Sequence, residues 1–252
     1  DFGGNAVPKR GGIAQSCEIW APTQSANGAR AAALNVLGLP STATDKVVVH
    51  TTYAGGGLGR KFENDFVAQA VQVAKVLKKP VKLFWSREED FSNDQYRPMA
   101  LVKVKAGLDA NGEISAWDYR NVSPSISRQR NPAATNVDSQ AVEGAVDLAY
   151  EFPARRTQWV PQPSGIPLGF WRSVGSSINT FVVESMIDEL ADEAGKDPFE
   201  FRRNMLLHNE RLLRLFDKLD AMSAWRKTLP AGRAWGMAYS RAFNTHVAQV
   251  AE

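Results

Sequence analysis

The chain has 252 residues, of which 44% are hydrophobic and 23% charged, enough for one large hydrophobic core or two smaller ones. No apolar run approaches the ~18 residues that a membrane-spanning helix needs. The net charge of +3 is small, and the basic pairs Arg128/Arg130 and Arg155/Arg156 are not clustered with aromatic residues, which argues against nucleic-acid binding. The single cysteine, Cys17, excludes an intrachain disulfide, a multi-cysteine zinc site and an iron–sulfur cluster built from this chain alone.

The first part of the chain alternates short β-rich runs with helical patterns. The patterns predict strands at residues 16–20, 47–52 and 81–86, and helices at residues 25–37 and 63–77. Gly38 and Pro40 follow the first helix as stop signals, and Lys78 and Lys79 place cations at the end of the second. Cys17 lies within the first strand pattern, where a lone cysteine is usually a small core residue.

The second part begins with a hairpin and continues with helices. The patterns predict hairpin strands at residues 99–108 and 113–122, helices at residues 177–194, from 197 onward and at 209–224, and strands at 235–239 and 246–250. Asp197, Pro198 and Glu200 provide the N-cap, N1 and N3 residues of a helix start. Residues 123–146 are polar and weakly patterned, which indicates a long loop. The fold class is therefore mixed α/β (α+β), without an internal repeat.

A glycine-rich loop, residues 53–61 (Tyr-Ala-Gly-Gly-Gly-Leu-Gly-Arg-Lys), joins a predicted strand to a predicted helix. Such a loop suits an anion, because glycines let the backbone approach closely and the helix start supplies free N–H groups. The common nucleotide motifs nevertheless fail. A Walker A loop would need glycine in place of Arg60, and G-x-G-x-x-G fails at Arg60 or at Phe62, depending on its first glycine. Taken alone, the loop fits a tight structural turn equally well.

The three histidines give no sign of a metal site or of a catalytic triad. His50 alternates with valines in a strand pattern, His208 follows a helical stretch, and His246 lies in a late strand pattern. No pair of them has the i, i+4 spacing of zinc ligands on a helix, so an ordinary structural role is favoured for each.

Two further segments, together with the glycine loop, give a resemblance to a known family. Thr23-Gln24 precedes the loop, and Phe170-Trp171-Arg172-Ser173-Val174-Gly175 follows it much later. In this order the three segments resemble the TQ, GGGFG-type and AFRGFG-type segments of the molybdenum hydroxylases, the family of xanthine dehydrogenase and aldehyde oxidase, with Leu58 replacing phenylalanine in the loop. Residues 86–90 and 197–206 extend the resemblance over nearly the whole chain, and residues 60–66 look most like the isoquinoline 1-oxidoreductase β-subunit branch.

The resemblance implies a site for molybdopterin with molybdenum, in the cytosine dinucleotide form, that the protein surrounds without ligating the metal. By position, the cofactor-binding residues would be Gln24, Gly55, Gly56, Gly57, Leu58, Gly59 and Arg172. Gln24 would donate a hydrogen bond to an oxo ligand, the backbone N–H groups of Leu58 and Gly59 would do likewise, and Arg172 would add a positive charge. Phe62 and Trp171 would line the substrate pocket. Xanthine dehydrogenases have glutamate at the position of Phe62, so a purine substrate is disfavoured.

Family members hydroxylate a carbon beside a heteroatom, or oxidise an aldehyde, with oxygen from water. Their general base is a glutamate in a G-x-G-E-type segment, which this chain lacks, and neither Glu184 nor Glu252 replaces it. We therefore expect no catalytic residue within this chain and no activity from it alone. The resemblance also implies a small partner subunit with two [2Fe-2S] clusters, in some members a cytochrome, and it favours the bacterial periplasm over the cytoplasm.

The expected domain organisation is a first molybdopterin-binding domain at residues 1–232, incomplete at its N-terminus, and the truncated start of a second at residues 233–252. The chain would then be a fragment of a longer catalytic subunit. Two other interpretations stay open at this stage. One is a non-catalytic interaction scaffold of the same fold without cofactor, and the other is an unrelated nucleotide-binding enzyme that has only the glycine loop.

Overall fold

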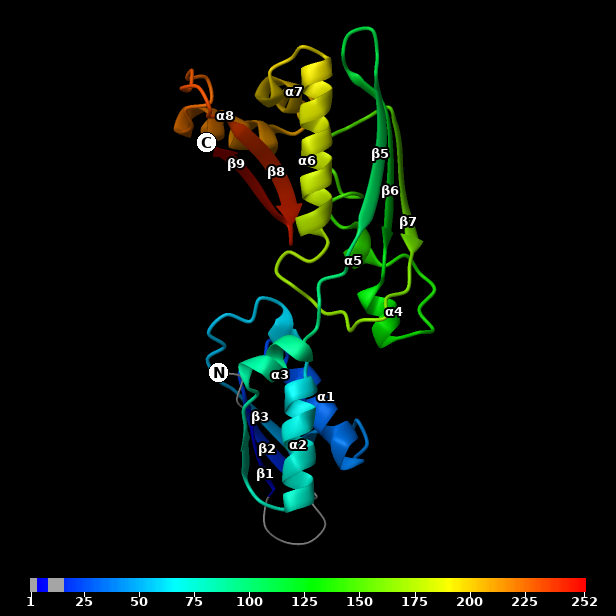
Figure 1. The fold of residues 1–252 in the computed structure, drawn as a ribbon, viewed down its shortest axis with the longest axis vertical. Coiled ribbons are helices and arrows are strands. Elements are labelled where there is room, and N and C mark those ends of the chain that lie inside the picture. The colour runs from blue at the N-terminus through cyan, green and yellow to red at the C-terminus, as the bar shows by residue number, and fades with distance from the viewer. Residues whose placement is uncertain (1–3, 9–15) are drawn as a thin grey trace. The chain divides into compact units, whose positions relative to one another are not determined.

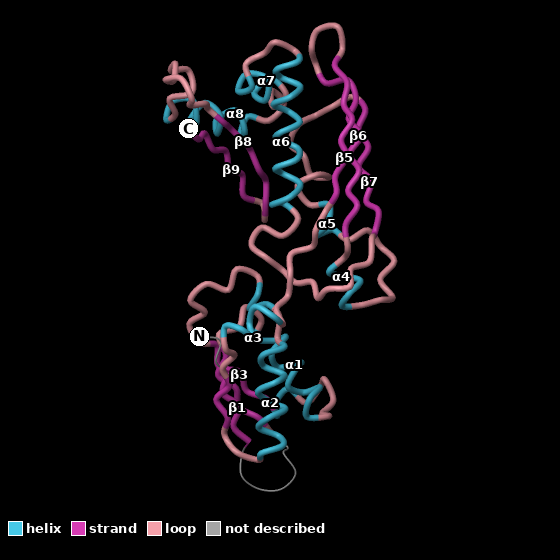
Figure 2. The backbone as a smooth tube through the Cα atoms, viewed as in Figure 1, coloured by secondary structure: helices cyan, strands magenta, loops and turns pink. Residues whose placement is uncertain are grey.

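A computed structural model describes residues 4–8 and 16–252, and the chain forms two compact units. Unit 1 contains residues 1–97 and 165–172, and unit 2 contains residues 98–164 and 173–252. Helices and strands alternate in both units, which confirms the mixed α/β class (Figure 2). None of the helices in the described ranges combines the length and the apolar composition that crossing a bilayer requires.

Unit 1 is a four-stranded sheet with helices packed on one face (Figure 1). The strand order is β3 (Val47–Thr51), β2 (Cys17–Ala21), β1 (Gly4–Pro8) and β4 (Val81–Leu83). Strand β1 is antiparallel to β2 and β4, whereas β2 and β3 are parallel and pair Ile19 with Val49. The packed helices are α1 (Ala26–Leu37) and α2 (Asp65–Leu77). Short elements complete the unit: η1 (Thr44–Lys46), η2 (Arg60–Phe62) and α3 (Arg87–Ser92).

The core of unit 1 follows from the predicted periodicities. Strands β2 and β3 bury alternate residues against helices α1 and α2, and the buried side chains include Ile19, Val47, Ala29, Leu34, Phe66, Val67 and Val71. Ser25 caps α1 by accepting from the Gly28 N–H, and Gly38 ends it in the left-handed conformation at φ 73°. Burial raises the pKa of the Cys17 thiol to about 11, as expected for a small core residue.

Unit 2 has a three-stranded sheet, a long helix and a terminal hairpin. The sheet order is β5 (Leu101–Leu108), β6 (Ile114–Ser123) and β7 (Ala154–Pro161), with β5–β6 antiparallel and β6–β7 parallel. Helix α6 (Ser176–Glu193) lies between this sheet and the hairpin of β8 (Gly236–Ala242) and β9 (Thr245–Ala251) (Figure 1). Helices α7 (Pro198–Asn204) and α8 (Glu210–Met222) complete a shared core around Trp117, Ile187, Phe199, Phe216 and Tyr239.

Several predicted elements differ from the structure. Strand β7 was not predicted, because its side chains are mostly exposed or half-buried and give no apolar alternation. The strand predicted at residues 81–86 ends at Leu83, since Ser86 caps helix α3 by accepting from the Glu89 N–H. The loop predicted at residues 123–146 contains the short helices α4 (Ile126–Arg130) and α5 (Ser139–Val142). Each is only about one turn long and is too short to show a helical period.

Candidate functional site

The Thr23–Gln24 turn is fixed to the end of the glycine loop. It follows strand β2, and the Gln24 N–H donates to the Lys61 carbonyl at 2.8 Å. The buried Thr23 hydroxyl lies 3.2 Å from the same carbonyl oxygen, and it also accepts from the Ser25 N–H at 2.9 Å. These bonds satisfy the backbone between a strand and a helix, and they bring Gln24 beside a loop that is more than thirty residues away in sequence.

The side chain of Gln24 binds the glycine loop directly. Its Oε1 accepts a hydrogen bond from the Gly59 N–H at 3.0 Å. At Gly57, a Cβ atom would lie 2.3 Å from the same oxygen, so any larger residue there would displace the Gln24 side chain from this position. The Gly59 N–H, expected to contact a cofactor, therefore holds the Gln24 carboxamide in this structure. Because Oε1 is used in this way, the amide NH₂ is the part of Gln24 that remains to donate to a ligand.

The backbone of the loop is open on one side. Gly55 and Gly56 have φ of 62° and 95°, and a Cβ atom at either would meet no atom within 4 Å. Leu58 also has a positive φ, 52°, and its side chain is exposed. Gly57, between Gly56 and Leu58, does not have a positive φ, so the sign of φ alternates along residues 56–58. Successive residues of alternating handedness turn their backbone N–H groups toward a common side, the arrangement that forms anion-binding concavities.

Residues 167–172, which include the first half of the third segment (Phe170 to Arg172), pack against the other end of the loop. A Cβ atom at Gly59 would lie 2.5 Å from the Phe170 carbonyl oxygen, and the Phe62 and Phe170 rings meet edge to face at 5.2 Å. Trp171 and Arg172 are exposed beyond this contact. The structure thus brings Gln24, Gly57, Gly59 and Phe62 together with the segment that carries Arg172, all within unit 1.

A model of the molybdopterin cofactor-binding domain matches residues 6–206 of the chain. The chain belongs to this family. Among its relatives, isoquinoline 1-oxidoreductase subunit beta of Brevundimonas diminuta is 28% identical over 94% of the chain and 31% of the relative. The aldehyde oxidoreductase molybdenum-binding subunit PaoC of Escherichia coli K12 is 30% identical over 73% of the chain and 24% of the relative. The chain therefore spans about a third or less of these proteins.

Solved structures show the same fold for this molybdopterin cofactor-binding domain. Aldehyde oxidoreductase from Desulfovibrio gigas superposes with a TM-score of 0.71 at 19% identity, over 95% of the chain and 27% of that protein. Quinoline 2-oxidoreductase from Pseudomonas putida 86 gives a TM-score of 0.70 at 20% identity, over 88% of the chain and 30% of that protein. The family membership excludes the unrelated nucleotide-binding enzyme that the glycine loop alone had left open.

The residues around the glycine loop fit the cofactor of this family. They offer backbone N–H groups and one carboxamide, which are neutral donors suited to an anionic group. Residues 4–8 and 16–252 contain no cluster of three or more histidine, cysteine or acidic side chains placed to hold a metal ion. The histidines lie apart, since His50 pairs with Glu18, His208 with Glu151, and His246 with Tyr239.

Sequence reasoning missed the ionic support of the loop in this molybdopterin cofactor-binding domain. Arg60 donates two hydrogen bonds to Asp65, at 2.8 and 2.9 Å, and one to Asp94, and its guanidinium lies 5.4 Å from the Trp85 ring centroid. Burial alone would lower the pKa of Arg60, but the bonds and charges of the two aspartates outweigh it, and the pKa is raised. Arg60 is therefore a structural cation. Neither its five-residue spacing from Asp65 nor its 34-residue spacing from Asp94 matches the i, i+3 or i, i+4 pattern that predicts an ion pair on a helix.

Lys61 is also a buried part of the loop. Its ammonium group donates to the Ala54 carbonyl, and burial lowers its pKa. The lysine thus connects the last residue of the loop to its second residue, and the sequence alone had suggested no role for it.

Proposed function

We propose that this domain forms one wall of the molybdenum cofactor site in the catalytic subunit of an oxidoreductase. The enzyme would hydroxylate N-heteroaromatic compounds or oxidise aldehydes, using oxygen from water. The observation that carries the proposal is the bond from the Gly59 N–H to Gln24 Oε1, which orients the carboxamide beside the open glycine loop. The names of the isoquinoline and aldehyde oxidoreductase relatives support the reaction class.

Each residue of the site has a defined task in this proposal. Gln24 presents its NH₂ group as a fixed neutral donor, while Gly55, Gly56 and Leu58 present backbone N–H groups. Arg172 contributes a guanidinium that stays positively charged at any relevant pH. Phe62 and Trp171, both about half exposed at 42% and 51%, would shape the apolar side of the substrate pocket. When bound, the cofactor supplies the electron acceptor and the site for water-derived oxygen.

The wider assembly belongs to the same proposal. The cofactor would be the cytosine dinucleotide form, and the general base would come from residues outside positions 1–252. Electrons would pass to a small subunit with [2Fe-2S] clusters, and the first molybdopterin-binding domain would end near residue 232. Support comes from the resemblance of the chain to the isoquinoline 1-oxidoreductase branch and from relatives that are named as subunits.

Replacing Gln24 by glutamate tests the proposal in the intact enzyme. The introduced carboxylate would still accept from the Gly59 N–H, but a second carboxylate oxygen would replace the NH₂ donor. Because a hydrogen bond to a charged group contributes about 1.5–3 kcal/mol, we expect the molybdenum content to fall at least about tenfold. Elemental analysis of the purified enzyme measures this content, and thermal unfolding shows whether the domain keeps its stability.

Gln69→Glu is the matched control for this experiment. Gln69 lies in the same unit, and its Oε1 also accepts from an N–H group, the indole of Trp85, at 2.8 Å. The same change of charge there should leave the molybdenum content unaltered. Equal molybdenum contents in the Gln24→Glu and Gln69→Glu enzymes would refute the assignment of Gln24 to the cofactor.

Phe62 provides a test of substrate class. An aromatic side chain cannot accept a hydrogen bond from a polar purine edge, and an unpaired buried polar group costs about 1–3 kcal/mol. We therefore expect Phe62→Glu to lower kcat/KM for flat apolar heteroaromatics by about 5- to 150-fold, while Phe62→Leu keeps the substrate preference. Steady-state kinetics of the wild type and both variants, with apolar and polar heteroaromatic substrates, measure this preference. Similar losses of stability with unchanged preference in both variants would mean that Phe62 serves only to pack on Phe170.

A further inference from the structure

Residues 94–97 (Asp-Gln-Tyr-Arg), here named the bridging segment, contact both the glycine loop and the 167–172 segment. We propose that this segment is a positioning element of the candidate site, and that Arg97 is the positioning residue for Trp171 and Arg172. The structural part of the proposal is independent of any reaction. Its consequence for cofactor and substrate rests on the function proposed above.

The first end of the bridging segment is tied to the glycine loop. The Asp94 carboxylate accepts from Arg60 Nε, and it also accepts from the Gln95 N–H at 2.7 Å. Arg60 directly follows Gly59, whose N–H holds Gln24. Arg60 and Asp94 have side-chain exposures of 15% and 29%, so solvent screens this ion pair less than a surface pair. Asp94 therefore sets where the segment starts relative to the loop.

The middle of the bridging segment pairs with the 167–172 segment through the backbone. The Tyr96 N–H donates to the Pro167 carbonyl at 3.0 Å, and the Gly169 N–H donates to the Tyr96 carbonyl at 3.0 Å. Tyr96 and Leu168 form a parallel bridge in this way. A Cβ atom at Gly169 would lie 2.5 Å from the Cβ of Gln95, so the two backbones approach as closely as glycine allows. This backbone pairing fixes where residues 167–169 lie along the bridging segment, and these residues lead directly to Trp171.

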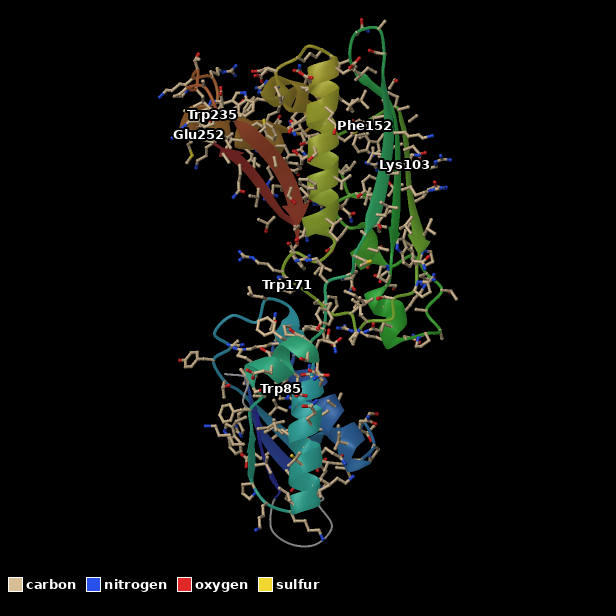
Figure 3. All side chains as sticks on the ribbon, in the orientation of Figure 1. Trp85, Lys103, Phe152, Trp171, Trp235 and Glu252 are labelled. Atoms are coloured by element: carbon tan, nitrogen blue, oxygen red, sulfur yellow. The ribbon has the colours of Figure 1, made fainter. Side chains whose placement is uncertain are left out.

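Arg97, the last residue of the bridging segment, contacts both Trp171 and Arg172. Its guanidinium donates to the Arg172 carbonyl at 2.9 Å and lies 5.8 Å from the centroid of the Trp171 ring. A planar guanidinium can stack on a ring and donate in its own plane at the same time, which an ammonium group cannot do. Figure 3 labels Trp171, the side chain that Arg97 faces. Arg97 thus fixes the backbone of one predicted cofactor residue and the ring of one predicted pocket residue.

Within unit 1, the glycine loop, the bridging segment and residues 167–172 each contact the other two. Gly59 and Phe62 hold Phe170 from one side, the bridging segment holds residues 167–172 through separate contacts, and the Arg60–Asp94 pair joins the two supports. A segment held by two supports that are themselves connected loses few conformations when a ligand binds. Such preorganisation is the property that positions a site for binding and catalysis.

Hydrogen exchange measured by mass spectrometry on the 252-residue chain tests the positioning role without any cofactor. In Arg97→Met we expect amides of residues 165–172 to exchange at least about tenfold faster, while helices α1 and α2 keep their wild-type rates. Asp94→Asn should accelerate exchange in residues 165–172 and also in the glycine loop, because it removes the tie to Arg60. Arg97→Lys keeps the charge but loses the planar fork, and it should behave like Arg97→Met.

Arg87→Met is the control, since Arg87 is a 71% exposed arginine of the same unit that pairs with Asp90 three residues later in its own helix. It should leave all rates unchanged. Wild-type exchange of residues 165–172 in Arg97→Met and Arg97→Lys would overturn the proposal, as would a uniform increase over the whole unit. In the intact enzyme, faster exchange without any change of molybdenum content or substrate preference would confirm the positioning of the segment and count against the proposed function alone.

Discussion

Replacing Arg202 by methionine is expected to lower the free energy of unfolding by about 3–5 kcal/mol, the usual cost of removing one partner of a buried ion pair. Arg202 is fully buried, and its Nε donates to Glu184 Oε2 at 2.9 Å, while its second NH₂ group donates to the Glu184 carbonyl at 2.9 Å. The same carboxylate accepts from the Tyr150 hydroxyl at 3.0 Å and from the Tyr239 N–H at 2.9 Å. The Glu184 carboxylate thus connects helix α6 to helix α7, to strand β8 and to the residues before β7.

The loss should depend on pH in a defined direction. Burial already raises the pKa of Glu184, and removal of Arg202 raises it further because the compensating charge disappears. A carboxyl whose pKa is higher in the folded state than in the unfolded state destabilises the fold above the unfolded-state value of about 4.3. Because the pKa of Glu184 is already raised in the wild-type fold, the deficit of Arg202→Met relative to the wild type should grow as pH rises from that raised value, which lies above 4.5, toward 7, and shrink on acidification.

Arg203→Met is the neighbouring control. Arg203 pairs with Asp217 at 2.9 Å, but the two side chains are 32% and 56% exposed, so the expected loss is at most about 1 kcal/mol. Equilibrium urea unfolding of the three proteins at several pH values measures the comparison. Similar losses at positions 202 and 203 would mean that the Glu184 network does not hold unit 2 together.

The elements with strong local signals were predictable from the sequence. Helix α1 starts after the Ser25 cap and ends at Gly38, helix α7 starts after Asp197, and the β5–β6 hairpin turns at Asp109 to Gly112, as expected. These features depend on neighbouring residues only. Strand β7 depends instead on pairing with β6 more than thirty residues earlier, and its exposed side chains carry no period.

The site shows the same division between local and long-range information. Motif order places Gln24, the glycine loop and Arg172 at one cofactor site. The structure brings Gln24 to Gly59 and Gly59 to Phe170, whereas the convergence of the Arg172 side chain on the same cavity stays a prediction. The roles of these residues toward a cofactor stay predictions. The partners Asp94 and Arg97 were not predictable, because they act through contacts whose residues are 34 and 75 positions apart and follow no spacing rule.

Replacing Gly59 by alanine should disrupt the meeting point of the three segments. Alanine at φ 94° costs about 1–3 kcal/mol in backbone strain, and its Cβ would lie 2.5 Å from the Phe170 carbonyl oxygen and 2.7 Å from the carbonyl carbon. Backbone atoms cannot move aside as a flexible side chain can, so overpacking should add about 1–3 kcal/mol. We expect lower stability of unit 1 and, in the intact enzyme, loss of bound molybdenum.

Gly56→Ala separates the two causes, because Gly56 has nearly the same φ, 95°, but a Cβ atom there would meet nothing within 4 Å. Gly56→Ala should lose only the free energy that backbone strain costs, without the cost of a Cβ contact. The difference in unfolding free energy between the two variants therefore measures the contribution of the close packing of Gly59 against Phe170. Urea unfolding followed by tryptophan fluorescence measures this difference. Equal losses in the two variants would show that Gly59 is kept for its backbone conformation alone, and the glycine loop would then not depend on close packing against the segment that carries Arg172.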